Sequence, residues 1–229
     1  YYLGKEGGIL NAIIRSLHLA GGGTLVALVI SLPIALFLET YVMKTRWARY
    51  VRLTLDILWG IPSIVYGAFA FTLMLAMGLR ASMLGGIIVL ALLEIPIMTR
   101  AMDEVIRLMP EELSQASLAV GASKLETALR VTVRQMLPGI VTATLLAFGR
   151  GIGDAASVLY TAGYTDRIPT SLSSPTASLP LAIYFQLGTP YPEVQQRAYA
   201  SALVLTLIVL IVSLGSRLVS ARLGRFINR

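Results

Sequence analysis

The sequence predicts an all-α bundle of membrane-spanning helices. Hydrophobic residues make up 56% of the 229 residues, charged residues make up 14%, and the mean hydropathy is +0.75. Soluble domains carry about 25% charged residues. The apolar residues also gather into five long runs that lack the polar stripe of a helix in a soluble bundle. We therefore expect one membrane domain that covers residues 1–229.

The five apolar runs are the predicted spans, because each reaches or approaches the roughly 20 residues that a helix needs to cross a bilayer. In order they cover residues 16–38, 57–79, 83–99, 136–161 and 198–219. The third run is short and contains Glu94, and the fourth is interrupted by Arg150 and Asp154.

Prolines fall within or beside three of these runs, at Pro33, Pro62 and Pro96. Each proline removes a backbone donor, which a membrane helix tolerates where neighbouring helices or water satisfy the freed carbonyl. These positions predict kinked helices, which either line a pathway or serve packing alone.

The basic residues predict the orientation of the chain, because cytoplasmic segments of membrane proteins are rich in lysine and arginine. The rich segments hold Lys44, Arg46, Arg49 and Arg52 after the first run, Arg100, Arg107, Lys124, Arg130 and Arg134 after the third, and Arg217, Arg222, Arg225 and Arg229 at the end. These segments are expected to be cytoplasmic and residues 162–197 external. The net charge of +7 then reflects topology, and we expect no binding of nucleic acid. An external N-terminus also predicts a sixth span that precedes this sequence.

A polar segment between the third and fourth runs predicts a short separate helix at residues 110–121. Pro110 suits a first helical position, Glu112 complements the helix dipole in the first turn, and Gly121 suits a C-terminal cap. One face offers small and apolar side chains, from Leu113, Ala116 and Val120. Such a face fits a protein partner, and the alternative is an amphipathic helix that lies on the lipid surface.

The spacing in this segment resembles the loop motif of type I ABC transporter permeases. That motif has a Glu-Ala-Ala triplet, then Gly after three residues, then an aliphatic residue after nine. Here the positions hold Gln115, Ala116 and Ser117, then Gly121 and Ala122, and then Val131. The resemblance implies a coupling helix that docks into a groove of a separate cytoplasmic ATPase through Glu112, Gln115, Ala116, Ser117, Gly121 and Ala122. Two positions depart from the motif, because Gln115 replaces the acid and Arg134 replaces the usual first proline.

Other segments resemble the phosphate-specific (Pst) permeases within that family. The matching segments are GGILNAIIRSL at 7–17, GIPSIVYG at 60–67, EIPIMTRAMDEVIRLMP at 94–110, and Arg150, Gly153 and Asp154, with Asp154 in place of a glutamate. LPGI at 137–140 and LPLAIY at 179–184 favour the A-type subunit over the C-type.

This resemblance implies a type I (MetI-like) permease fold in the cytoplasmic membrane of a bacterium or archaeon, and phosphate import by alternating access. The implied partners are a C-type permease in a heterodimer, a cytoplasmic ATPase dimer, an extracytoplasmic phosphate-binding protein and membrane lipid. Two alternatives stay open. One is a permease for another oxyanion, such as molybdate, sulfate or phosphonate, and the other is a membrane transporter or scaffold outside the ABC class.

Five side chains are candidates for the substrate pathway. Arg150 and Asp154 lie i, i+4 in an apolar run, where charges usually face protein or water and where these two could pair. They serve either the anion path or helix packing alone. Arg100 closes the third run, and its alternative is an interfacial arginine that extends to water. Ser63 and Tyr66 offer hydroxyls after Pro62, and their alternative is packing.

The sequence contains no pattern for catalysis or metal binding. It lacks the phosphate loop G-x-x-x-x-G-K-[ST], so ATP and Mg²⁺ are expected on the partner ATPase. There is one histidine, His18, no cysteine and no H-E-x-x-H motif. We therefore expect no catalytic residue, no metal ligand and no cofactor bound by this chain.

Overall fold

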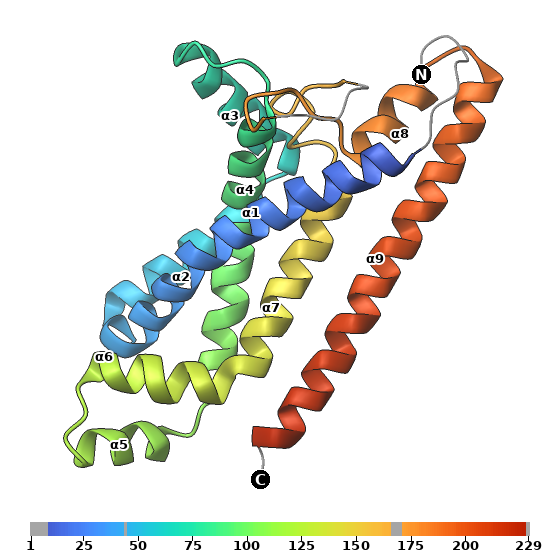
Figure 1. The fold of residues 1–229 in the computed structure, drawn as a ribbon. Coiled ribbons are helices and arrows are strands. Elements are labelled where there is room, and N and C mark those ends of the chain that lie inside the picture. Colours follow the sequence, from blue (N-terminus) through green and yellow to red (C-terminus); the bar gives the residue numbers. More distant parts are fainter. Residues whose placement is uncertain (1–8, 44, 166–170, 228–229) are drawn as a thin grey trace. The chain divides into compact units, whose positions relative to one another are not determined.

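The computed structural model describes residues 9–43, 45–165 and 171–227 (Figure 1). Every regular element in this part of the chain is helical, which confirms the predicted all-α class. In chain order the elements are α1 (Leu10–Phe37), η1 (Leu38–Val42), α2 (Arg46–Gly60), α3 (Ser63–Ala76), α4 (Met83–Ile106), α5 (Glu111–Ala119), α6 (Lys124–Glu126), η2 (Thr127–Thr132), α7 (Val133–Gly153), α8 (Leu179–Leu187) and α9 (Pro192–Ile227), where η denotes a π-helix.

Four helical segments of the described residues are long and apolar enough to cross a membrane: Leu10–Val42, Met83–Ile106, Lys124–Gly153 and Pro192–Val219. A fifth span is present if α2 and α3 form one broken span, since they are bent by 95°. The predicted second run therefore differs from the structure, where it is not one continuous helix. Pro62 is the reason, because its extended backbone (φ −58°, ψ 139°) precedes α3 and proline cannot donate to a helix ladder.

The fourth span also differs from its predicted run. Its helix begins earlier, at Lys124, and passes through the π-helix η2 before α7. It ends at Gly153, whereas the apolar run continues to residue 161. Turns replace the helix after Gly153, and Asp154 is therefore outside α7.

The contacts divide the described chain into two compact units. The first unit consists of the residues up to 26, residues 61–94 and residues 148–212. The second unit consists of residues 27–60, residues 95–147 and the residues from 213 onward. Helices α1, α4, α7 and α9 therefore contribute residues to both units. The prediction of a single domain over 1–229 stays a prediction.

The first unit is built around the beginning of α4. Its apolar core contains Leu19, Ala70, Met83, Val89, Leu90, Val158, Ala162 and Leu181. Helices α1 and α4 approach closely, because a Cβ on Gly23 would lie 2.8 Å from the Cβ of Leu90. Backbone N–H groups of Ser82 and Met83 donate to the carbonyls of Thr161 and Ser174, both at 2.9 Å. The connection after α7 thus satisfies donors that the start of a helix leaves unpaired.

The second unit has a core of small and flexible side chains. Its members are Ala27, Ala35, Leu36, Met98, Met102, Ile106, Ala128, Ile140, Ala143 and Ala147. Alanines allow α1, α4 and α7 to approach one another, and methionines fill the irregular space between them. The Ser31 hydroxyl donates to the Ile95 carbonyl at 3.2 Å and adds a polar link between α1 and α4.

Candidate functional site

The structure has a short helix, α5, where the sequence predicts one. It begins at Glu111, so Pro110 is the N-cap residue and not the first helical residue. Gly121 ends the segment with φ +89°, a left-handed conformation that favours glycine. Its N–H donates to the Leu118 carbonyl at 3.0 Å, and the N–H of Ala122 donates to the Ser117 carbonyl at 3.2 Å. These bonds close the last turn, as expected for a glycine C-cap.

Helix α5 presents most of its surface outward. None of its nine residues, all of which the structure describes, is buried. Apolar side chains before and after the helix are also strongly exposed, since Leu108 is 80% exposed and Val120 is 86% exposed. The exposed acids Glu111 and Glu112 occupy the first turn. The segment can therefore offer both charge and apolar area to a partner.

Helix α5 is linked to the beginning of the following span (Figure 1). The hydroxyl oxygens of Ser117 and Thr127 lie 2.9 Å apart, and Thr127 is buried in η2. Ser123 and Glu126 form a capping box before η2, in which the Ser123 N–H donates to Glu126 Oε2 at 2.9 Å and the Glu126 N–H donates to Ser123 Oγ at 3.3 Å. Sequence reasoning missed this box, although its S-x-x-E spacing was a signal.

Arg150 and Asp154 do not form the predicted pair. Arg150 lies in the last turn of α7 with an exposed side chain and makes no ion pair with any described residue. Asp154 follows the helix, and its carboxylate accepts hydrogen bonds from the Ser157 N–H at 2.8 Å and from the Ser157 hydroxyl. The aspartate therefore stabilises the turn, whereas the guanidinium of Arg150 is exposed and has no carboxylate partner among the described residues.

Helix α3 packs against the same turn. A Cβ on Gly67 would lie 2.6 Å from the carbonyl oxygen of Ser157, so only glycine permits this contact. Ser63 begins α3 with a partly exposed side chain, and Tyr66 packs on the core of the first unit. The structure thus brings α3, with its two candidate hydroxyls, to the turn that Asp154 stabilises.

Glu94 is a buried acid in the first unit. Its side chain is fully buried in α4, and its polar neighbours include Thr24 and Asp154. Its Oε1 occupies the space beside Gly151, where a Cβ would overlap it. A fully buried acid in a membrane-spanning helix is costly, so it usually has a function or a close partner.

Arg100 lies in the second unit and is held by three carboxylates. Its Nε donates to Asp56 Oδ1 at 2.7 Å and its Nη1 to Asp103 Oδ2 at 3.3 Å. Its Nη2 lies 3.2 Å from Glu104 Oε1. The predicted pathway arginine is therefore engaged in ion pairs in this conformation.

Asp103 extends these ion pairs to Arg52. The Nε and Nη2 of Arg52 donate to the two carboxylate oxygens of Asp103 at 2.7 and 2.9 Å, and Nη2 also reaches Glu39 at 3.2 Å. Asp103 is fully buried, so this two-pronged bond satisfies a charge that water does not reach. Sequence reasoning missed Asp103. Only its i, i+3 spacing from Arg100 indicated a contact.

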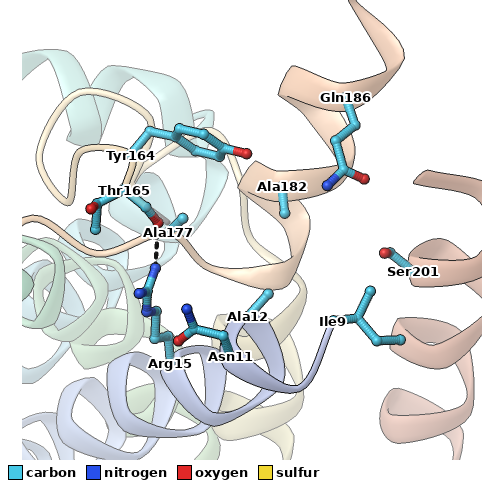
Figure 2. Close-up of a pocket in the computed structure, with 10 residues that line it drawn as sticks. All are labelled: Ile9, Asn11, Ala12, Arg15, Tyr164, Thr165, Ala177, Ala182, Gln186 and Ser201. Atoms are coloured by element: carbon cyan, nitrogen blue, oxygen red, sulfur yellow. Dashed lines mark hydrogen bonds between the residues drawn. The ribbon is translucent and has the colours of Figure 1, made fainter. Parts of the chain in front are cut away.

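A small cavity lies among α1, α8 and α9 in the first unit (Figure 2). Arg15 lines it and donates from Nη1 to the Thr165 carbonyl at 2.5 Å. Gln186 and Ser201 contribute polar atoms from α8 and α9. Its volume of about 20 Å³ suits one water molecule and is too small for a tetrahedral oxyanion. The cavity is therefore not the transport site in this conformation.

These features define a polytopic α-helical membrane protein with an exposed helix between two spans. A family model described as "Binding-protein-dependent transport system inner membrane component" matches residues 31–228. The phosphate transport system permease protein PstA of Haemophilus influenzae is 34% identical over 93% of this chain and 76% of its own length. PstA 1 of Mycobacterium tuberculosis is 35% identical over 93% of this chain and 70% of its own length. The chain belongs to the binding-protein-dependent inner membrane permeases and, within them, to the PstA type.

Solved structures support the same fold. Two crystal forms of the MetNI methionine ABC transporter, both in inward-facing conformations, match with TM-scores of 0.75 and 0.74. In each case the alignment covers 94% of this chain and 95% of the other at 17% identity. This likeness confirms the predicted MetI-like permease fold.

Proposed function

We propose that this chain is a membrane-spanning subunit of an ATP-driven phosphate importer. The observation that carries the proposal is the 34–35% identity to PstA phosphate permeases along 93% of the chain. The MetI-like fold and the exposed helix α5 support it. The same relatives favour phosphate over molybdate, sulfate or phosphonate, and they favour an ABC permease over a secondary transporter or a scaffold.

Arg150 is the leading candidate for contact with the anion. A guanidinium offers several donors that fit the oxygen atoms of phosphate, and Arg150 has no carboxylate partner among the described residues. Asp154 acts beside it by fixing the turn after α7. Ser63 and Tyr66 contribute hydroxyl donors from α3, whose Gly67 packs on that turn. Arg100 provides a second positive group in the other unit.

Helix α5 transmits the action of the ATPase in this proposal. Glu112, Gln115, Ala116, Ser117, Gly121 and Ala122 form the docking segment. Its movement reaches the Lys124–Gly153 span through the hydroxyl contact of Ser117 with Thr127 and through the packing of α5 on η2. That span carries Arg150 near its end, so ATP-driven movement of α5 would change the access of Arg150 to each side of the membrane.

The proposed assembly contains a C-type permease, a cytoplasmic ATPase dimer and an extracytoplasmic phosphate-binding protein, in the cytoplasmic membrane of a bacterium or archaeon. ATP and Mg²⁺ bind to the ATPase, and this chain performs no catalysis and holds no cofactor. Lipid covers the apolar faces of its spans, including the exposed leucines of α9.

The test is ATP hydrolysis by the assembled transporter in liposomes, with its binding protein and a panel of oxyanions. The proposal predicts stimulation by phosphate and by no other member of the panel. Stimulation by sulfate or molybdate alone would contradict the substrate, and failure to assemble with any ATPase would contradict the class of transporter.

A further inference from the structure

The three carboxylates around Arg100 differ in how exposed they are on the described chain. The Asp103 side chain is 0% exposed, whereas the side chains of Asp56 and Glu104 are 47% and 61% exposed. The Arg100 side chain is itself 18% exposed. One carboxylate thus contacts the arginine from the buried side, and two contact it from the exposed side.

Asp103 cannot readily exchange its partners. Both of its oxygens accept hydrogen bonds from Arg52, at 2.7 and 2.9 Å, and Arg52 is held again by Glu39. Asp56 and Glu104 have no second ion pair among the residues that the structure describes. They are the two members of the network that can leave Arg100 without stranding a buried charge.

The network carries more negative than positive charge. In the described chain, two guanidinium groups, of Arg52 and Arg100, face four carboxylates, of Glu39, Asp56, Asp103 and Glu104. An anion that approached Arg100 would have to displace a carboxylate and would meet repulsion from the others. The arginine is therefore a weak site for phosphate while these carboxylates surround it.

We propose that Asp56 and Glu104 promote release of the anion. They compete with phosphate for the guanidinium of Arg100 and so shorten the time that phosphate stays bound there. The inference rests on the proposed function. A transport pathway needs contacts that attract the anion but do not trap it, and a competing carboxylate on an exposed side chain meets that need. Arg100 lies in a segment predicted to be cytoplasmic, so the competition would act where phosphate leaves the protein.

The expected effect is modest because both acids are partly exposed. Ion pairs in such positions contribute small energies, which correspond to about two- to five-fold in affinity. Asp56→Asn removes the negative charge from the partner in the shortest Arg100 contact and keeps the size of the side chain. Glu104→Gln removes the negative charge of the more exposed partner. The double variant should change the affinity for phosphate more than either single variant does.

The experiment uses the complete transporter in liposomes and measures uptake of radiolabelled phosphate in the presence of unlabelled phosphate on the ATPase side. In Asp56→Asn and Glu104→Gln, the unlabelled concentration that halves uptake should fall about two- to five-fold, and further in the double variant. Glu193→Gln is the matched control, because Glu193 is an exposed acid with no ion pair among the described residues. Its half-inhibitory concentration should match that of the unsubstituted protein.

Two results would overturn the inference while leaving the proposed function intact. The half-inhibitory concentration could stay unchanged in all acid variants although uptake is normal. Alternatively, the variants could lower only the melting temperature of the complex, which would mean that the acids serve structure alone. Failure of the proposed function has a different signature, since the unsubstituted transporter would then show no phosphate uptake.

Discussion

The carboxylate of Glu94 occupies the space that a side chain at Gly151 would need. Glu94 lies on α4 and Gly151 on α7, and both are buried in the first unit. A Cβ built on Gly151 would overlap Oε1 of Glu94. This contact fixes the two helices at a short separation one residue from Arg150.

Gly151→Ala should therefore destabilise the protein by about 1–3 kcal/mol, the usual cost of forcing an extra methyl group into a packed interior. The measurement is the melting temperature of the purified transporter in detergent. Adding Glu94→Ala removes the overlap, so the double variant should recover part of the loss. An unchanged melting temperature in Gly151→Ala would mean that the Glu94 carboxylate moves aside and that this contact does not limit the packing of the two helices.

The ion pair of Arg52 with Asp103 should be the largest polar contribution to the stability of the second unit. Asp103→Ala should cost about 3 kcal/mol, because it leaves a partly buried guanidinium without its two-pronged acceptor. Replacing both partners, as Arg52→Met with Asp103→Leu, should cost less than Asp103→Ala alone. Thermal unfolding of the two variants measures the difference, and a larger loss in the double variant than in Asp103→Ala would contradict this role of the ion pair.

Gly121 should be required for the shape of the α5 segment. Its φ of +89° is strained for any other residue, so Gly121→Val should cost about 1–3 kcal/mol locally and distort the docking segment. We expect ATPase activity that no longer responds to the binding protein. The control is Gly215→Ala, since a Cβ at Gly215 meets no atom within 4 Å. Normal ATPase stimulation in Gly121→Val would argue against the coupling role.

The hydroxyl contact of Ser117 with Thr127 should affect coupling more than assembly. Ser117→Ala and Thr127→Val each remove one hydroxyl of a pair whose oxygens lie 2.9 Å apart. A hydrogen bond of this kind contributes about 1 kcal/mol, so the phosphate transported per ATP should fall in each variant while the ATPase remains bound. The double variant should be no worse than the single ones. Strictly additive effects would mean that the two hydroxyls act independently.

The features that the sequence predicted well are those with local causes. The span lengths follow from apolar runs, and the end of α5 follows from Gly121, which adopts the left-handed conformation that glycine favours. The 95° bend at Pro62 was only partly predictable, because proline indicates a break but not its angle.

The features that the sequence did not predict depend on contacts between distant residues. The i, i+4 spacing suggested that Arg150 pairs with Asp154, but the helix ends at Gly153 and Asp154 binds Ser157. Arg52 and Asp103 are 51 positions apart, and their contact arises only when α2 packs beside α4. Hydropathy and helical periodicity carry no information on such pairs.

The most direct test of the account is phosphate uptake by the complete transporter with substitutions at Arg150. Arg150→Lys keeps the positive charge and Arg150→Gln removes it. Neither substitution breaks an ion pair among the described residues. Uptake of radiolabelled phosphate into liposomes should fall at least ten-fold in Arg150→Gln, because removal of a charge-assisted contact costs about 1.5–3 kcal/mol. Arg150→Lys should retain part of the uptake. ATPase binding should be normal in both. Equal uptake by Arg150→Gln and the unsubstituted protein would contradict the pathway proposed here.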